Sequence, residues 1–163
     1  LKLFNPIKEI FIVPKRDDIH LANQYSNYTN RSVNMTNNNT NIENKYYTEN
    51  IIEEMALYFN GGLRTLKHSY AYYHTVQPYL HHTNKLPPGV LMYSFAIYPE
   101  QYQPSGACNF TNFKTVQLEL KLKDPRAMAD TIEKKIKYDI TIYASSYNIL
   151  RIEKGTCNLI FTT

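Results

Sequence analysis

Several features that mark well-known functional classes are scarce in this sequence or absent from it. The 163 residues include only five glycines and no glycine-rich loop, which excludes a phosphate-cradling P-loop. No apolar run approaches the roughly 18 residues that a membrane-spanning helix needs. Tryptophan is absent, and charged residues make up 20% of the chain. The length suits one domain that buries a modest hydrophobic core.

Cysteine is also scarce, with only Cys108 and Cys157. The two residues would form one disulfide if their Cα atoms came within about 7 Å of each other. We expect instead two reduced, half-buried thiols of the kind found in proteins that assemble inside cells.

Groups that would form a catalytic centre are missing. Ser105 lies between Pro104 and Gly106, not in the Gly-x-Ser-x-Gly turn that exposes a serine nucleophile. Glu53 and Glu54 are adjacent, so on a strand they point to opposite faces and do not form an acid–base pair. We therefore predict that the protein is not an enzyme and has no catalytic residue.

Four of the five histidines lie close together in the sequence, which raises the question of a metal site. His81 and His82 are adjacent and would point in opposite directions on an extended chain. No carboxylate or cysteine lies at a spacing typical of metal ligands. We predict no bound metal and no cofactor, and we assign His68, His74, His81 and His82 to turns and contact surfaces.

Positive charge is present but is not clustered. The formal net charge is +4, from 18 Lys and Arg against 14 Asp and Glu. Acidic residues are interspersed among the basic ones, and no segment carries the basic stripe that a nucleic-acid site needs. We therefore expect no nucleic-acid partner.

Aromatic residues, in contrast, are abundant, with fifteen tyrosines and seven phenylalanines. Tyrosine suits half-buried sheet faces and interfaces, because its ring is buried while its hydroxyl keeps a polar contact. The composition thus favours β-strands and surfaces that contact other proteins.

Alternating apolar residues predict a series of β-strands. The clearest covers residues 115–123, where a valine and three leucines occupy every second position. The pair Asn60-Gly61 lies between two such runs and is typical of a tight hairpin. The other predicted strands span 7–13, stopping at Pro14, then 55–59, 63–66, 70–76, 91–98, 139–152 with a bulge near Ser145, and 158–161.

About seven strands with turns between them predict an all-β protein with an antiparallel β-sandwich fold. Helices are expected only in connections. Residues 126–137 favour one short helix, and residues 51–55 fit a helical turn as well as a strand. A polar stretch at about 15–50, dense in asparagine and threonine, is predicted to be a long loop within a single domain spanning 1–163.

Residues 93–110 are especially informative. They follow the pattern Tyr-Ser-Phe-Ala-x-x-Pro-Glu-x-x-Gln-Pro-Ser-Gly-x-x-Asn-Phe, which resembles the C-terminal jelly roll of the major capsid proteins of nucleocytoplasmic large DNA viruses. The family's serine after Asn-Phe is Thr111 here, a mild change. Other blocks resemble the family in the same order: Ile7-Lys8-Glu9-Ile10, 57–61 with Arg64, 73–79 with His82-Thr83, and 142–144 followed by 147–151.

The resemblance implies a structural virion protein. Members of this family assemble as homotrimers in which six jelly rolls form a pseudo-hexagonal capsomer. Such capsomers tile an icosahedral shell over an internal membrane, so the implied partners are sibling chains, neighbouring capsomers and other capsid proteins. The implied location is the virion shell, assembled in the host cytoplasm. Because the family's chains carry two jelly rolls, we expect this chain to be a fragment that holds an incomplete C-terminal one.

The motif residues have structural rather than chemical roles under this hypothesis. Amide side chains would bond unpaired backbone groups at strand ends, glycines would permit tight turns, and arginines would bind carboxylates or carbonyls. The candidate structural residues are Asn60, Gly61, Arg64, Gln77, Pro78, His82, Gln103, Pro104, Ser105, Gly106, Asn109, Phe110, Tyr147, Asn148 and Arg151.

An alternative hypothesis is a secreted β-sandwich recognition module that binds glycans or protein partners. It draws on the tyrosine-rich composition and on five Asn-x-Ser/Thr sequons, which matter only in a secretory compartment or with viral glycosylation enzymes. Occupied glycans and a Cys108–Cys157 disulfide would favour this alternative. The candidate glycosylation sites are Asn27, Asn30, Asn34, Asn38 and Asn109.

Overall fold

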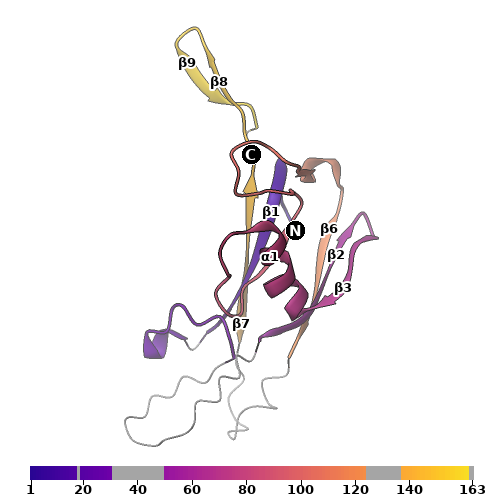
Figure 1. Cartoon of the computed structure of the whole chain (residues 1–163), viewed down its shortest axis with the longest axis vertical. Helices are drawn as coiled ribbons and strands as arrows, with labels where there is room; N and C mark the ends of the chain where they lie inside the picture. The colour runs from indigo at the N-terminus through magenta and orange to yellow at the C-terminus, as the bar shows by residue number, and fades with distance from the viewer. Residues whose placement is uncertain (18, 31–49, 124–136, 162–163) are drawn as a thin grey trace, which may run out of the picture.

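The computed structural model describes residues 1–17, 19–30, 50–123 and 137–161. Within these ranges the chain folds mainly into antiparallel strands (Figure 1). The predicted helix at 126–137 and the central part of the predicted loop at 15–50 lie largely outside the described residues. Among the residues described, no helix is long and apolar enough to cross a lipid bilayer.

The first sheet is built around one long central strand, β1 (Pro6–Arg16). Along one edge β1 pairs with β4 (Leu91–Ser94) and then with the short β5 (Cys108–Asn109). Along its other edge β1 pairs with β7 (Tyr138–Ser146). All three pairings are antiparallel, as the sandwich prediction requires.

The second sheet has the strand order β3-β2-β6. Strands β2 (Ile52–Phe59) and β3 (Gly62–Ser69) form the predicted hairpin. Its turn has positive φ angles of 49° at Asn60 and 80° at Gly61, which explains why this pair occupies the position. Strand β6 (Val116–Leu122) pairs with the other edge of β2 and confirms the predicted strand at 115–123.

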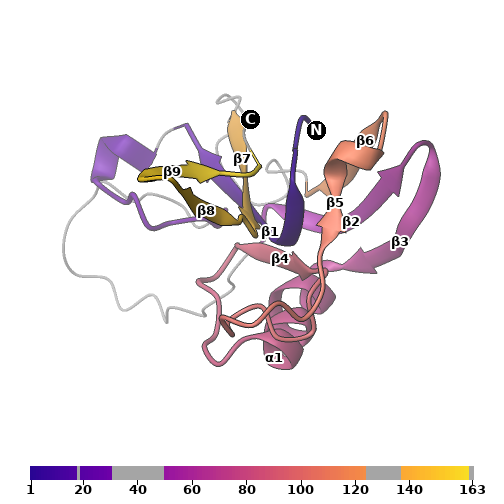
Figure 2. The same cartoon turned by 90° about the horizontal axis from the view of Figure 1, so that it is seen from above.

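The hydrophobic core lies between the two sheets, which Figure 2 shows from above. Both central strands contribute to it, so the β2 strand interpretation of residues 51–55 is confirmed and the helical turn is wrong. The buried core residues are Ile7, Ile10, Ile12, Ile51, Ile52, Met55, Leu57, Tyr73, Leu91, Phe110 and Val116.

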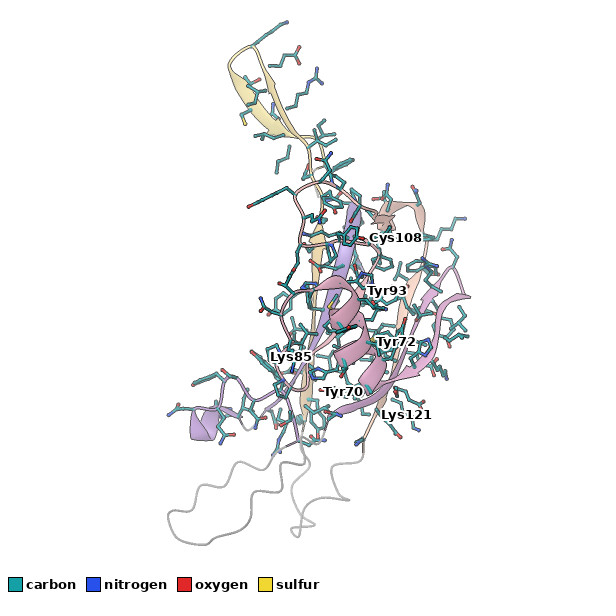
Figure 3. All side chains as sticks on the ribbon, in the orientation of Figure 1. Tyr70, Tyr72, Lys85, Tyr93, Cys108 and Lys121 are labelled. Carbon is teal, nitrogen blue, oxygen red and sulfur yellow. The ribbon has the colours of Figure 1, made fainter. Side chains whose placement is uncertain are left out.

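The predicted strand at 70–76 is wrong, because this segment is helical. It forms a π-helical turn, η2 (Tyr72–Val76), which continues directly into α1 (Gln77–His81). Tyr70 stacks on His74 with ring centroids 4.7 Å apart. A helix brings residues four positions apart into contact, whereas a strand would separate them by about 13 Å. Figure 3 shows Tyr70 and Tyr72 on this segment. Strand propensity of the aromatic residues was therefore outweighed by packing.

Strand β1 continues past Pro14, although the sequence predicted that it would stop there. The Asp17 amide donates a hydrogen bond to the Lys137 carbonyl, next to β7. Counting back from Asp17, every second residue of β1 therefore directs its backbone N–H and C=O groups towards β7. The backbone of Pro14 therefore points to the edge of β1 that pairs with β4. The β1–β4 pairing ends at Ile12, two residues before Pro14. The missing amide hydrogen of Pro14 removes no ladder hydrogen bond, and the strand is not interrupted.

Two predicted strands are shorter than expected. The strand at 91–98 ends at Ser94, whose hydroxyl donates to the Ala96 carbonyl at 2.7 Å and closes a local turn. The strand at 139–152 is divided into β7 and β8 (Leu150–Glu153), and β8 forms a hairpin with β9 (Thr156–Leu159). The hairpin extends away from the two sheets (Figure 1).

The remaining short elements are the 3-10 turns η1 (Ile19–Ala22) and η3 (Phe110–Asn112).

Candidate functional site

Three chain segments meet at the imidazole ring of His82. Its Nε2 lies 2.8 Å from Oε2 of Glu9 on β1, and its Nδ1 lies 3.1 Å from Oε1 of Glu100 in the loop after β4. The Glu9 side chain is only 7% exposed. Both ring nitrogens thus lie within hydrogen-bonding distance of a carboxylate oxygen, so the imidazole ties β1 to the loop after β4.

Further contacts tie the same segments together. The Thr83 amide donates to Oε2 of Glu100 at 3.0 Å and lowers the pKa of that carboxyl, an effect to which the Thr83 hydroxyl and His82 add. Lys8 donates to the Pro99 carbonyl at 2.7 Å. Three of the blocks noted in the sequence thus converge on one polar cluster, buried at Glu9 and exposed at Glu100, which we call the His82 cluster.

The sequence prediction missed Glu9 and Glu100 as partners of His82. The two carboxylates are 73 and 18 positions away along the chain, so no ligand-like spacing could indicate them. One local signal was present, namely Glu9 in a run from Ile7 to Val13 that is apolar apart from this residue and Lys8. A buried carboxylate at such a position needs a partner.

Gln77 has a second structural role, at the outer edge of β4. Its side chain is 4% exposed; Oε1 accepts from the Ser94 amide at 3.2 Å, and Nε2 donates to the Tyr72 hydroxyl at 2.9 Å. Nδ1 of His74 lies 2.9 Å from the Val90 carbonyl at the same edge. The helical segment thereby satisfies backbone groups of β4 that have no partner strand.

Tyr73, which the sequence assigned to a strand, anchors the helical segment in the core. Its hydroxyl donates to the Met55 carbonyl at 3.1 Å and lies near the Thr65 hydroxyl and the Leu66 carbonyl. The side chain has no exposed surface. Burial raises the pKa of this phenol, and the Thr65 hydrogen bond opposes the rise.

Three of the motif asparagines bond backbone groups near strand ends. Oδ1 of Asn60 accepts from the amides of Lys114 and Thr115 at 2.8 and 3.1 Å and caps the start of β6. Oδ1 of Asn109 accepts from the Thr111 amide. The Asn148 side chain joins its own segment to the Phe161 backbone and closes the base of the β8–β9 hairpin.

The other motif residues occupy different environments. Pro78 and Phe110 are buried, and Phe110 packs edge-on against Phe59 at 5.4 Å. Ser105 accepts from the Tyr98 amide at 2.8 Å, beside the exposed Pro104 and Gly106. Gln103 and Arg64 are exposed. Arg151 is also exposed and forms an ion pair with Glu153. Tyr147 is half-buried, and the Lys8 ammonium lies over its ring.

The sequons differ in accessibility. Asn30 is buried, and its amide nitrogen, the atom that would carry a glycan, has no exposed surface. Glycosylation at Asn30 is therefore incompatible with the folded chain. Asn27 is half-buried, with Nδ2 donating to Gln24, and Asn109 is exposed. Asn34 and Asn38 lie outside the described residues.

Neither a metal site nor a disulfide is formed in the part of the chain that the structure describes. No group of three metal-ligating side chains occurs there. Cys108 and Cys157 are free thiols, one on β5 within the sandwich and the other on the β8–β9 hairpin. Burial raises the pKa of the Cys108 thiol, and the nearby charge of Arg64 opposes this.

Comparison with known proteins identifies the family. A family model described as large eukaryotic DNA virus major capsid protein matches residues 1–157. The major capsid protein of Chrysochromulina ericina virus is 34% identical over 123 residues, 76% of this chain and 20% of that protein. The major capsid protein of Paramecium bursaria Chlorella virus 1 is 32% identical over 124 residues, 68% of this chain and 28% of that protein. The chain thus spans less than a third of either relative.

Solved structures confirm the fold. The PBCV-1 virus capsid chain matches with a TM-score of 0.70 and 24% identity, over 100% of this chain and 45% of that one. The predicted jelly-roll sandwich is therefore correct. None of these matches supports a secreted recognition module. The sequence blocks, the two antiparallel sheets and the match over residues 1–157 together show that this chain belongs to the major capsid protein family of large eukaryotic DNA viruses.

Proposed function

We propose that this chain forms part of the capsid shell of a large DNA virus, as the C-terminal jelly roll of its major capsid protein. The observation that supports this proposal most strongly is the family match over residues 1–157, which includes every described strand of both sheets. Several motif residues support this function because they bond backbone groups or carboxylates, namely Asn60, Gln77, His82 and Asn148. Their role is to hold a shape for assembly rather than to act on a substrate, and we expect no catalysis.

The mechanism of assembly is contact between rigid sandwiches. The described surface includes a group of exposed apolar side chains on the helical segment and on the loop after β4. The Nδ1 atom of His81 lies 2.9 Å from the Ile97 carbonyl, which brings these two parts together. We call this surface the helix–loop patch; it consists of Val76, Tyr79, Leu80, Ile97, Tyr98 and Tyr102.

The helix–loop patch has the composition of a protein contact surface. Tyr79 is 85% exposed and Tyr102 is fully exposed, and solvent-exposed tyrosines in an apolar group are typical of interface cores. We propose that the patch contacts a sibling chain within a homotrimeric, pseudo-hexagonal capsomer. Neighbouring capsomers and other capsid proteins would contact other faces.

The test uses the full capsid polypeptide that contains this chain. Native mass spectrometry would compare trimers of the parent protein with those of a Tyr79→Ser and Tyr102→Ser double variant. We expect the variant trimers to dissociate at least about tenfold more readily, because two interface anchors are lost. Tyr25→Ser, at an exposed tyrosine outside the patch, is the control. Equal stability of all three trimers would refute the patch assignment, and a monomeric parent protein would refute the trimer.

The polar stretch at 15–50 is dense in asparagine and threonine, a composition that suits a solvent-exposed position. We propose that it lies on the outer surface of the capsid, within a single domain spanning 1–163. Assembly would take place in the host cytoplasm, with the opposite side of the shell close to an internal membrane. Limited proteolysis of intact particles should cut this stretch first. Its protection in particles, together with cleavage in free protein, would place it at a contact instead.

A further inference from the structure

The β8–β9 hairpin has no cover among the described residues. It extends beyond the two sheets (Figure 1), and its side chains lie away from both of them (Figure 3). All eight residues of its two strands are exposed. A two-stranded hairpin on its own is only marginally stable in water and needs a surface to pack against. The hairpin is therefore an element that still lacks a partner surface.

The strand register makes one face of this hairpin apolar. Leu150 lies opposite Leu159, and Ile152 lies opposite Cys157. Directly opposite residues share a face, and so do residues two positions apart along a strand, so these four side chains form one surface, which we call the hairpin face. The other face of the hairpin is polar and consists of Arg151, Glu153, Thr156 and Asn158. The hairpin is thus amphipathic, with no charged side chain on the hairpin face.

The base of the hairpin is fixed to the rest of the fold. The Asn148 side chain donates to the Phe161 carbonyl at 2.7 Å and accepts from the Phe161 amide at 3.1 Å. The Tyr147 amide donates to the Pro6 carbonyl at 2.9 Å. A surface held in place in this way loses less conformational freedom when it binds a partner. The hairpin is therefore prepared for contact with another molecule.

The base also adjoins the loop that carries part of the helix–loop patch. Lys8 connects the two, because its ammonium donates to the Pro99 carbonyl at 2.7 Å and lies over the Tyr147 ring, 5.8 Å from the centroid. Pro99 directly follows Ile97 and Tyr98 of the patch. The loop side of the patch and the hairpin therefore leave the sandwich close together. A sibling chain that contacts the patch lies within reach of the hairpin as well.

The symmetry of a trimer decides what kind of surface faces the helix–loop patch. In a closed ring of three chains, each contact away from the axis joins two different surfaces, because the rotation brings one side of a chain against another side of the next. The patch therefore needs a second, uncharged apolar surface on the sibling. The hairpin face has this character, with Leu150 57% and Ile152 73% exposed. By comparison, the two exposed leucines of β3 share that strand with Arg64 and Lys67.

We infer that the hairpin face of one chain docks on the helix–loop patch of the next chain in the capsomer, an inference that rests on the trimer proposed above. The occupant of the hairpin face is thus a second copy of this chain. The tyrosine rings of the patch would pack against the branched side chains of the hairpin, while the polar face of the hairpin stays in water. Each chain gives one hairpin and receives one, so the ring closes with every hairpin covered.

Cys157 gives a direct test, because it is exposed and lies on the hairpin face. In trimers of the full capsid polypeptide, Leu80→Cys would place a second thiol in the patch. Under mild oxidation we expect a disulfide between Cys157 and the introduced thiol of the neighbouring chain, detected by electrophoresis without reductant and by mass spectrometry of linked peptides. Since the bond requires Cα atoms within about 7 Å, linkage should exceed that of Leu66→Cys, at an exposed position on β3, by at least about tenfold.

The same experiment contains the results that would overturn the inference. Equal linkage in Leu80→Cys and Leu66→Cys would show that the hairpin has no preferred contact with the patch. A disulfide within one chain would show that the hairpin covers the patch of its own chain. Linkage of Cys157 to a different capsid protein in intact virions would identify another partner for the hairpin face.

Matched variants of the hairpin test its apolar face separately. Leu150→Ser with Ile152→Ser removes the apolar side chains of β8 from the hairpin face. Arg151→Ser with Asn158→Ser changes the polar face of the same hairpin and is the control. In native mass spectrometry we expect trimers of the first variant to dissociate at least about tenfold more readily than those of the control. Equal dissociation would overturn the inference, and the disulfide experiment stands even if the first variant fails to fold.

A double-mutant cycle separates this inference from the proposed patch contact. Residues that touch each other have non-additive effects. Combining the apolar hairpin variant with Tyr79→Ser and Tyr102→Ser should therefore weaken trimers by less than the product of the two separate effects. A full product would place the hairpin on another surface and overturn the inference. Weakening by the patch variant alone would also overturn it, while the proposed patch contact would stand. A monomeric parent protein would refute both.

Discussion

Individual polar residues hold this sandwich together at points that its strands do not reach. His82 is the clearest example, because it bridges a buried carboxylate on β1 and an exposed one in the loop after β4. The sequence predicted His82 as a motif residue at a turn or contact surface, and it named no partner for the imidazole ring. Its partners were not predictable, because contact across 73 positions depends on the completed fold.

Replacing His82 by alanine should destabilise the protein. Among the described residues, Lys8 at 3.8 Å would then be the one counter-charge left to Glu9. We expect a loss of about 2–3 kcal/mol in the free energy of unfolding, somewhat below the cost of breaking a fully buried pair. Urea denaturation measures this, with His20→Ala at an exposed position as the control. Equal denaturation midpoints for His82→Ala and the parent protein would contradict the assigned role.

Glu100 should contribute to the acid sensitivity of the fold. The Thr83 amide, the Thr83 hydroxyl and His82 lower its pKa below the ordinary value of 4.5. A carboxyl with a lowered folded-state pKa adds stability above its ordinary pKa, and this stability is lost as the pH falls through the folded-state value. Glu100→Gln should therefore lose less stability than the parent protein between neutral pH and about pH 3. Parallel loss in both proteins would show that this carboxyl contributes nothing.

At the scale of elements, the sequence predicted a strand well where one face of the strand is exposed to solvent and the other is buried. Strand β6 and the Asn60-Gly61 hairpin were found because alternation and turn chemistry are local properties. The helical segment at 70–81 was missed because its β-branched and aromatic residues favour a strand locally. Its conformation is fixed by tertiary contacts: the buried Tyr73 and the two bonds of Gln77.

Gln77 tests the role of the helical segment at the edge of β4. Gln77→Ala would leave the buried Ser94 amide without its acceptor, which should cost about 1–3 kcal/mol in the free energy of unfolding. Hydrogen exchange of the Ser94 amide should accelerate more than that of central-strand amides. Gln103→Ala, at a fully solvated glutamine, is the matched control and should change neither property. An unchanged Ser94 exchange rate in Gln77→Ala would contradict the edge-sealing role.

At the scale of the whole molecule, the fold and the family followed from the ordered sequence blocks, while the surfaces used in assembly did not. Sequence patterns indicate which residues are buried, but they do not show which sheet edges are left open or which exposed tyrosines lie together. The structure adds two such features: the outer edges of β6 and β7, with which no strand of the described residues pairs, and the helix–loop patch.

The outer edges of β6 and β7, which pair with no other described strand, predict that the 163-residue chain associates when it is expressed alone. Unpaired strands with partly uncovered apolar faces pair readily with other strands. Sedimentation velocity should show oligomers or aggregates whose proportion rises with concentration. A monomer that unfolds in one cooperative transition, with no tendency to associate, would contradict this expectation.

The central claim is that this chain is a building element of a viral shell. Electron cryomicroscopy of purified virions at a resolution that traces strands tests it most directly. We predict density for the sheets β4-β1-β7 and β3-β2-β6 in every capsomer, with the helix–loop patch at a contact between sibling chains. Shells whose capsomers contain no such domain, or virions that lack this polypeptide, would contradict the account.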